Sequence, residues 1–528
     1  MMEKGGCSMK KHIALLLVLA LLLTGCALPK NWSGYTAYRD MEYTRPDLDA
    51  HQAALDAACA AAENAHTLKE LENRILEYYA IFDECYTNYN LAYIQYCVDL
   101  SDIYWQKEYA FCAENIAQAD AGLDALYRAL AKSPYRTQLE GEDYFGAGYF
   151  DAYEGESHWD ETLLTYLEQE AALEDTYYSL CEEAYDVAYY SQEFFEDYAP
   201  DMEQVFLELV QLRQEMAAYL GYASYPEFAY DFYYYRDYTP QQAQAYFETV
   251  GQQMVSLYRR VETVQMDSCT AADTMEYLRQ CAQAMGGEIA DAFSLLSSRG
   301  LHHILPGENK QAISFEVFLD SYYEPFIFMN PEGTEYDQLT LAHEFGHFAN
   351  DFVCGGSYAG ADVAEVHSQA MEYLSLCYGQ DTADLTAIKK ADSICVYVEQ
   401  SAYSLFEHQV YGLTGAELTV ENIRELYTQI GMQFGFETRE WNVRDYVLIT
   451  HLFTEPLYMA SYVASNDVAF QIYQKELANP GKGLELYRQM LSSQDGYLIA
   501  FTENYGLKNP FDPGRVEEIC RALDPMFS

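Results

Sequence analysis

The chain has 528 residues, of which 83 are acidic and 30 basic, so its formal net charge at pH 7 is −53. A charge of this sign and size argues against nucleic acid or an anionic membrane as a binding surface. A chain of this length exceeds a single hydrophobic core, and we expect at least two lobes. Apart from Cys7 and Cys26, eleven cysteines remain without C-x-x-C spacing, which does not indicate a disulfide framework.

The N-terminus has the pattern of an export signal. Lys10 and Lys11 precede an apolar run over residues 13–23, and the run ends in Leu23-Thr24-Gly25-Cys26. The run is shorter than the ~20 residues that span a bilayer, and the pattern resembles a bacterial lipoprotein signal. We therefore predict a signal peptide at 1–25, lipidation of Cys26, a spacer over 26–40, and export to the outer face of the cell membrane. An uncleaved membrane anchor is the alternative.

The next part of the chain has the periodicity of amphipathic helices. Leu68, Leu71, Ile75, Leu76 and Tyr79 repeat at helical spacing, and similar patterns recur to about residue 197. Ala199-Pro200-Asp201 then has the form of a helix start. The pattern predicts an N-terminal helical lobe at 41–200 and a second lobe at 201–528.

A short segment in the second lobe is rich in strand-forming residues. Residues 325–330 contain Phe326, Ile327 and Phe328, and Asn330-Pro331-Glu332-Gly333 has the composition of a turn. The segment is either an edge strand that pairs with an extended peptide backbone or an ordinary strand of the core.

Shortly after this strand, His343-Glu344-Phe345-Gly346-His347 places two imidazoles four residues apart. On a helix, both point from one face and can bind the same metal ion, while Glu344 lies one step round and can reach a metal-bound water. Two neutral imidazoles with an oxygen ligand suit Zn²⁺. The apolar residues around the pair indicate a buried helix, where an unpaired glutamate is costly.

A third metal ligand is expected from the helical segment at 361–372. The metzincin pattern is excluded, because Val353 stands where that class has its third histidine. We predict Glu365 as the third ligand, with His367 as the rival, although His367 points away from Glu365 on a helix. Glu372 shares the face of Glu365 and could accept the free ring N–H of a ligand histidine.

His451, Tyr458 and Tyr462 are candidate donors to a developing oxyanion. Tyr458 and Tyr462 are four residues apart and share a helix face, and His451 lies about two turns before Tyr458. Neutral imidazole and phenol donors stabilise such charge in a dry site. With 51 tyrosines in the chain, the pair could also be packing residues, and the sequence does not choose between the two.

Together these motifs resemble the thimet oligopeptidase and oligoendopeptidase F family of zinc metallopeptidases, and the similarity extends over roughly residues 200–525. The residues that carry it are Leu212-Arg213, Met216-Ala217, Leu220-Gly221-Tyr222, Ser224-Tyr225, Glu227-Phe228, Pro325 to Asn330, Gly333-Thr334, Thr340 to His347, Glu365, Ser368-Gln369, Glu372, His451, Pro456-Leu457-Tyr458 and Tyr462.

The resemblance implies a mainly α, two-lobed zincin-type fold with a small β-sheet beside a deep active-site cleft. It also implies one zinc ion per chain on His343, His347 and Glu365, Glu344 as the general base, and oxyanion stabilisation by His451 with Tyr458 or Tyr462. The chain departs from many relatives at Asn350, where they have a further histidine, and at His367, where they have proline.

The sequence thus predicts a zinc endopeptidase that hydrolyses short unfolded peptides by a Glu344-activated water. Two alternatives remain: a peptide-binding lipoprotein without catalysis, and a related metallopeptidase that releases dipeptides from a C-terminus. The acidic charge would also steer cationic peptides toward a cleft, in a salt-dependent manner.

Overall fold

The computed structural model describes residues 36–141, 144–155, 159–184, 187, 191–262, 264–356, 360–436, 443–493 and 495–524. The predicted signal peptide and Cys26 lie outside these residues. Among the helices that the structure describes, none is both long enough and apolar enough to cross a bilayer. All eleven cysteines in the described ranges are free thiols.

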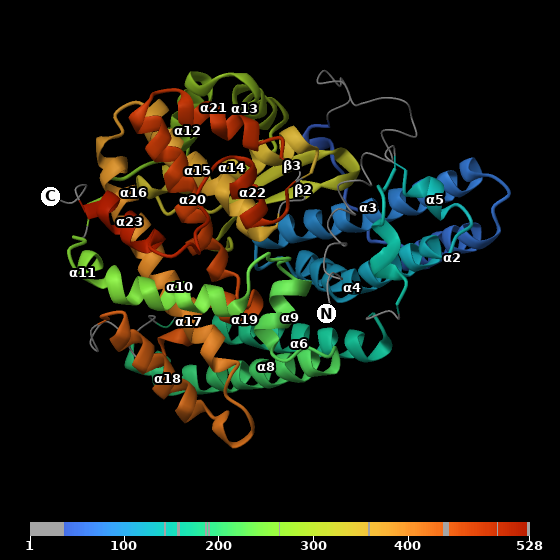
Figure 1. Ribbon diagram of the computed structural model, residues 1–528, viewed down its shortest axis with the longest axis horizontal. Helices are drawn as coiled ribbons and strands as arrows, with labels where there is room; N and C mark the ends of the chain where they lie inside the picture. Colours follow the sequence, from blue (N-terminus) through green and yellow to red (C-terminus); the bar gives the residue numbers. More distant parts are fainter. Residues whose placement is uncertain are drawn as a thin grey trace.

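Three long helices form the N-terminal part of the chain, α2 (Leu48–Asn64), α3 (Leu68–Val98) and α4 (Ile103–Ala131). Each begins at a polar residue whose side chain accepts a backbone N–H of the first turn, namely Asp47, Thr67 and Asp102. The apolar stripe predicted on α3 is its buried face, and the three helices enclose a core of their own together with α5 (Arg136–Leu139) and the 3₁₀ turn η2 (Tyr149–Tyr153). They project from the rest of the molecule in Figure 1.

The rest of the chain packs around a second, larger core. Between the N-terminal helices and the sheet, its helices are α6 (Glu161–Glu183), α7 (Gln192–Asp197), α8 (Ala199–Tyr219), α9 (Tyr225–Phe232), α10 (Pro240–Gln253), α11 (Val255–Tyr258), α12 (Ala271–Met285) and α13 (Gly287–Arg299). After the sheet they are α14 (Tyr336–Cys354), α15 (Ala361–Tyr378), α16 (Ala383–Cys395), α17 (Ser401–Val410), α18 (Val420–Gln433), α19 (Thr450–Thr454), α20 (Met459–Ala478), α21 (Lys482–Met490), α22 (Leu498–Asn504) and α23 (Arg515–Leu523).

The strands of the described residues form one three-stranded sheet of β1 (His302–Ile304), β2 (Ser314–Leu319) and β3 (Glu324–Met329), in the order β1-β3-β2. β3 pairs in parallel with β1 and antiparallel with β2. The segment at 325–330 is therefore not an edge strand, and that interpretation was wrong. An uninterrupted run such as Phe326-Ile327-Phe328 suits a central strand that is buried on both faces, as β3 is. β1 and β2 are the two edge strands of the described sheet, and β2 is only half-buried over most of its length.

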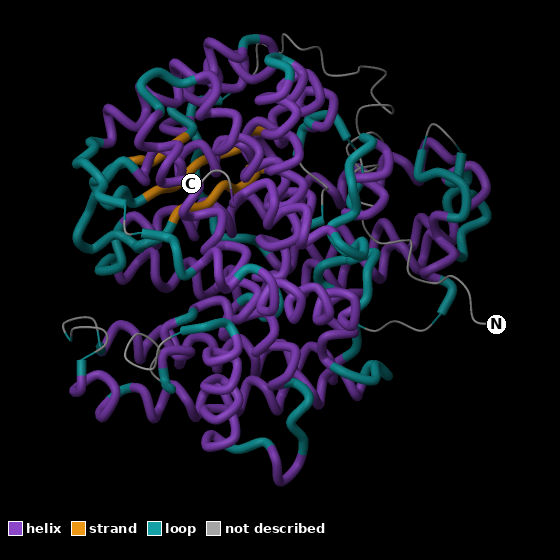
Figure 2. Tube along the Cα trace, turned by 60° about the vertical axis from the view of Figure 1, so that its left-hand side comes forward, coloured by secondary structure: helices purple, strands orange, loops and turns teal. Residues whose placement is uncertain are grey.

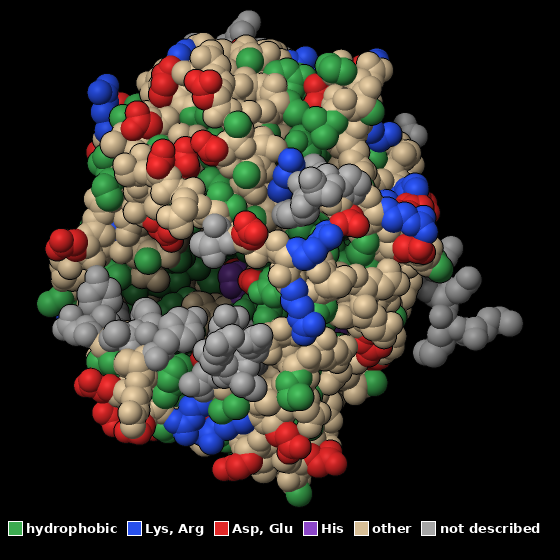
Figure 3. Space-filling model, turned by 90° about the vertical axis from the view of Figure 1, so that its left-hand side faces the viewer, with side chains coloured by type: hydrophobic (Ala, Val, Ile, Leu, Met, Phe, Trp, Pro, Cys, Tyr) green, Lys and Arg blue, Asp and Glu red, His purple; other side chains and the backbone are tan. Residues whose placement is uncertain are grey.

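The helix α14 packs against β2 and β3 on one side and against α15 on the other, and α15 packs in turn against α20. Figure 2 shows the strands in the upper body with helices around them. The fold is thus mainly α, with two lobes and a small sheet, as predicted. The space-filling view in Figure 3 shows a hollow between the upper and lower parts, with a histidine and an acidic side chain exposed inside it.

Candidate metal centre

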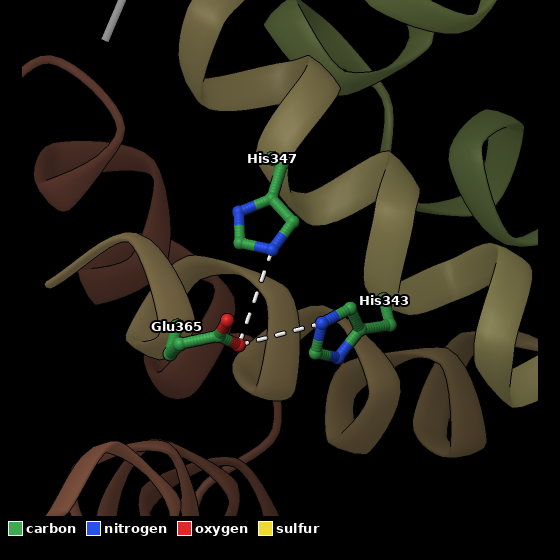
Figure 4. Close-up of side chains that lie close together, drawn as sticks. All are labelled: His343, His347 and Glu365. Carbon is green, nitrogen blue, oxygen red and sulfur yellow. Dashed lines mark ion pairs between the residues drawn. The ribbon is translucent and has the colours of Figure 1, made fainter. Parts of the chain in front are cut away.

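Two helices bring the predicted metal ligands together. His343 and His347 lie one turn apart on α14, and Glu365 faces them from the first turns of α15 (Figure 4). Glu365 Oε2 lies 3.3 Å from His343 Nε2 and 3.9 Å from His347 Nε2. One ligand atom from each residue lies within 4.8 Å of the other two. Two imidazoles and a carboxylate at this spacing fit a Zn²⁺ ion with one coordination position left open.

Gly346 permits the close approach of the two ligand helices. A Cβ atom at this position would lie 2.5 Å from the carbonyl oxygen of His367 and 2.5 Å from Ser368 Cα, both of them backbone atoms of α15. Real Cβ atoms are not found this close to backbone, so only glycine fits here. The glycine between the two histidines therefore sets how near α15 can come to the imidazoles.

Buried charges orient His343 from behind. Its Nδ1 lies 2.8 Å from Glu372 Oε1, and the other oxygen of Glu372 pairs with Lys389 Nζ at 2.6 Å. Lys389 is 2% exposed and also pairs with Asp392 at 2.8 Å. Burial alone would lower the pKa of His343, but Glu365 and Glu372 outweigh it and raise that pKa to about 9. The carboxylate on Nδ1 orients the ring so that Nε2 points toward Glu365.

Glu344 is buried beside the ligands and is hydrogen-bonded to a residue of the edge strand β2. Ser314, the first residue of β2, donates its hydroxyl to Glu344 Oε1 at 2.9 Å. Burial raises the pKa of the Glu344 carboxyl to about 7, against the lowering effects of His343 and of the Ser314 hydrogen bond. A carboxyl group with a pKa near neutrality can both accept and return a proton.

The rival ligand, His367, lies elsewhere. Its ring packs against Tyr487 and Phe501, with centroid distances of 5.9 Å to each, and it is 1% exposed. Burial lowers the pKa of its imidazole to about 3. His367 is therefore a neutral core residue and does not join the cluster.

The three predicted oxyanion donors lie together, but the two tyrosine hydroxyls make different contacts. Tyr458 donates to Glu365 Oε1 at 2.6 Å, so its hydroxyl is bound to a ligand carboxylate. The Tyr462 hydroxyl lies 3.4 Å from His451 Nε2, and His451 is 35% exposed. The rings of the two tyrosines are 5.2 Å apart. Tyr462 and His451 thus form a donor pair whose hydroxyl and imidazole are not bound to Glu365.

Sequence reasoning missed Ser314 and Lys389. Ser314 is one serine at the start of a strand 29 residues before His343, and Lys389 lies on α16, beyond the two helices that the motif defines. A hydrophobic pattern does not reveal such contacts, because each depends on two elements meeting in space. For Lys389, the only signal in the sequence is a lysine within a helical, partly apolar segment, and this is a weak indication of a buried ion pair. Ser314 has no such signal.

Comparison with known proteins agrees with this fold. Residues 38–158 match the model of the peptidase M3 N-terminal domain. The fold is similar to that of PZ peptidase A, solved with an inhibitor, with a TM-score of 0.80 and 18% identity over 93% of this chain and 98% of that one. A protein provisionally named oligoendopeptidase F from Bacillus anthracis str. Ames has a TM-score of 0.79 and 20% identity over 94% and 98% of the two chains. Oligoendopeptidase F from Enterococcus faecium has a TM-score of 0.60 and 13% identity over 91% and 97%. No curated protein sequence matches the chain.

The fold is therefore similar to that of the solved oligoendopeptidase F structures. The match of residues 38–158 to the M3 N-terminal domain and this shared fold confirm the resemblance to the M3 peptidases of the oligoendopeptidase F type.

Proposed function

We propose that the protein is a zinc-dependent endopeptidase that hydrolyses short unfolded peptides. The observation that carries the proposal is the convergence of His343, His347 and Glu365 beside the buried Glu344. His343, His347 and Glu365 would hold the ion, which, when bound, supplies Lewis acidity to a water and to the scissile carbonyl.

The residues of the chain account for the proton transfers. Glu344 takes a proton from the attacking water and returns it to the leaving amine, and the Ser314 hydroxyl holds its carboxylate beside the ligands for this role. Of the candidate donors, we assign His451 and Tyr462 to the developing oxyanion, where one such donor is worth about 3–4 kcal/mol. We assign Tyr458 to the orientation of Glu365, because its hydroxyl is bound there.

The open edge of β2 supports peptide as the substrate class. Among the strands that the structure describes, β2 pairs only with β3, and its first residue, Ser314, contacts Glu344. An extended peptide added along this edge would place its backbone next to the base, with affinity that depends little on side-chain identity. The hollow in Figure 3 between two helical bodies favours short, unfolded chains over folded proteins.

Hydrolysis of a mixed library of short peptides, followed by mass spectrometry, tests the proposal. We expect cleavage that a chelator abolishes and that Zn²⁺ restores. Glu344→Gln should keep one zinc ion per chain and lose about 10²–10⁴-fold in kcat. Retained cleavage in this variant would exclude Glu344 as the base, and peptide binding without cleavage by the wild type would favour the binding lipoprotein.

End-blocked peptides separate the two peptidase alternatives. An endopeptidase cleaves peptides with an amidated C-terminus, whereas an enzyme that releases C-terminal dipeptides needs the free carboxylate. We expect cleavage of the blocked peptides.

We further propose that the mature protein is anchored in a bacterial membrane by a lipid on Cys26, on the basis of the sequence pattern at residues 10–26. Labelling of cells with a fatty acid tests this anchor. The wild type should take up label and sediment with membranes, and Cys26→Ser should do neither.

A further inference from the structure

The segment that carries the proposed oxyanion donors is not held in place by regular secondary structure alone. Between α19 and α20, Leu457 has φ of +67°, a left-handed conformation that costs a leucine energy. Its N–H donates to Glu407 Oε1 at 2.7 Å, and its carbonyl accepts from Arg236 Nη2 at 3.0 Å. Such a conformation persists only where surrounding contacts determine it, so these two partners fix the residue directly before Tyr458.

Arg236 has the most extensive set of these contacts. Its side chain is 0% exposed and lies over the rings of Tyr230 and Tyr234, at 4.3 and 4.4 Å from their centroids. The hydroxyl of Tyr234 also donates to the Pro456 carbonyl at 2.7 Å. A buried guanidinium is costly without compensation, and here the ring faces and several acceptors provide it.

The acceptors of Arg236 belong to the two halves of the proposed site. Nη2 donates to Ser461 Oγ at 2.8 Å as well as to the Leu457 carbonyl, and Nε lies 3.3 Å from Asp362 Oδ1. Ser461 in turn donates to the same Asp362 oxygen at 2.5 Å. Leu457 and Ser461 directly precede Tyr458 and Tyr462, and Asp362 lies one turn before Glu365 on α15. One guanidinium therefore joins the donor segment to the helix that carries a metal ligand.

We propose that Arg236 is a positioning residue for the hydrolytic reaction, which sets the distance between the tyrosine segment and the ligand helix α15. The inference rests on the proposed peptidase function. The planar fork of arginine directs Nη2 and Nε along different lines, so it can serve both halves at once. A lysine ammonium at the end of a flexible stem cannot reproduce that geometry. Misplacement of a reacting group by about 1 Å can cost ~100-fold in rate.

The test compares three variants for kcat, KM, zinc content and inhibition by a phosphinic peptide, whose tetrahedral phosphorus resembles the reaction intermediate. Arg236→Lys should lower kcat about 100-fold, with KM within about threefold of the wild type. Ser461→Ala removes only the bridging hydroxyl and should lower kcat about tenfold. In both variants, zinc should remain at one ion per chain, and the phosphinic peptide should lose affinity in parallel with kcat/KM.

Arg515→Lys is the matched control, because Arg515 is another buried arginine of the same lobe. It pairs with Asp467 on α20 through Nε at 2.9 and 3.0 Å and contacts none of the site residues in the described structure. We expect this variant to lose thermal stability and to keep wild-type kcat.

The outcomes separate the two proposals. A wild type that cleaves peptides, with kcat unchanged in both Arg236→Lys and Ser461→Ala, overturns the positioning role and leaves the proposed function intact. Titration with the phosphinic peptide counts the folded, binding-competent enzyme. If kcat per competent molecule equals that of the wild type, so that only the folded fraction has fallen, the positioning role is also overturned. If Arg236→Lys does not fold, Ser461→Ala decides. A zinc-loaded wild type that cleaves no peptide overturns the proposed function and this inference together.

Discussion

Replacing Gly346 with alanine should weaken zinc binding without touching a ligand. The new Cβ would lie 2.5 Å from the His367 carbonyl oxygen, 2.9 Å from the carbon of that carbonyl and 2.5 Å from Ser368 Cα. Ordinary contacts between such atoms are about 3.5 Å, so the backbones of α14 and α15 must separate by about 1 Å. Neither backbone can avoid the clash by a side-chain rotation, because the atoms that meet belong to the main chain.

The magnitude follows from the ligand spacing. A tetrahedral zinc ion with bonds of about 2.0–2.1 Å needs ligand atoms about 3.3 Å apart. The Oε2 of Glu365 is now 3.3 Å from His343 Nε2 and 3.9 Å from His347 Nε2, and a 1 Å separation would take both pairs well beyond that value. Glu365 cannot easily follow, since Ser368 and Tyr458 hold its two oxygens. We expect zinc affinity to fall by about 10- to 100-fold, as when a supporting contact is lost.

Stability should fall as well, although alanine is the better helix former. The helix propensity gain is about 1 kcal/mol, and overpacking of this kind costs about 1–3 kcal/mol. Because the contact is backbone against backbone, we expect the cost at the upper end and a net loss of about 2 kcal/mol.

Competition with a fluorescent chelator measures the zinc affinity, and thermal unfolding of the metal-free protein measures the loss of stability. Gly155→Ala is the control, because a Cβ there meets nothing within 4 Å. Wild-type zinc affinity in Gly346→Ala would show that the approach of α14 to α15 does not set the ligand spacing.

Four further substitutions have distinct expected outcomes. Burial raises the pKa of Glu407 from its ordinary 4.5 to about 8, so the folded protein binds this proton more tightly than the unfolded chain does. The free energy of unfolding should therefore fall as pH rises from 4.5 to 8. Glu407→Gln should reduce this pH dependence, which urea unfolding at several pH values measures. Glu372→Gln weakens the orientation of His343 and should lower zinc affinity about 10- to 100-fold in chelator competition. Tyr462→Phe should lower kcat about 10²-fold at unchanged zinc affinity, whereas Tyr458→Phe should weaken zinc binding. Steady-state kinetics and zinc titration measure the two effects. If Tyr458→Phe lowered only kcat and Tyr462→Phe only zinc affinity, the roles assigned to the two tyrosines would be refuted.

Local patterns were sufficient to predict the parts of the fold that lie within single elements. The spacing of His343 and His347 specifies a helix face, and the apolar stripe from Leu71 to Tyr79 specifies another, because both depend only on the 3.6-residue period. Glu365 could be placed on a second helix, and the structure brings it to the histidines. The mainly α class with a small sheet followed from the same reasoning and from the family resemblance.

Relations between elements could not be predicted in this way. The run Phe326-Ile327-Phe328 indicates a strand, but whether it lies at an edge or in the middle depends on where β1 and β2 pair. The same holds for Tyr458 and Tyr462, which share a helix spacing but make different contacts, with Glu365 and with His451. Each of these facts is set by tertiary contacts far apart in the chain.

Metal binding and oxyanion stabilisation, the two tasks proposed for the site, depend on different structural contacts. The metal ligands stand on two long helices whose spacing is set by Gly346, and buried charges behind His343 hold its ring. The donor segment at 451–461 is irregular only between α19 and α20, at residues 455–458, and buried groups from three other parts of the chain hold it. Arg213 of α8 donates to the carbonyls of Leu452 and Phe453, Glu407 of α17 accepts from the Leu457 N–H, and Arg236, which follows α9, donates to the Leu457 carbonyl. Substitutions behind the helices should therefore alter zinc affinity, and substitutions behind the segment should alter kcat. Asp362 is the residue where both sets of contacts meet, so its replacement should change both quantities.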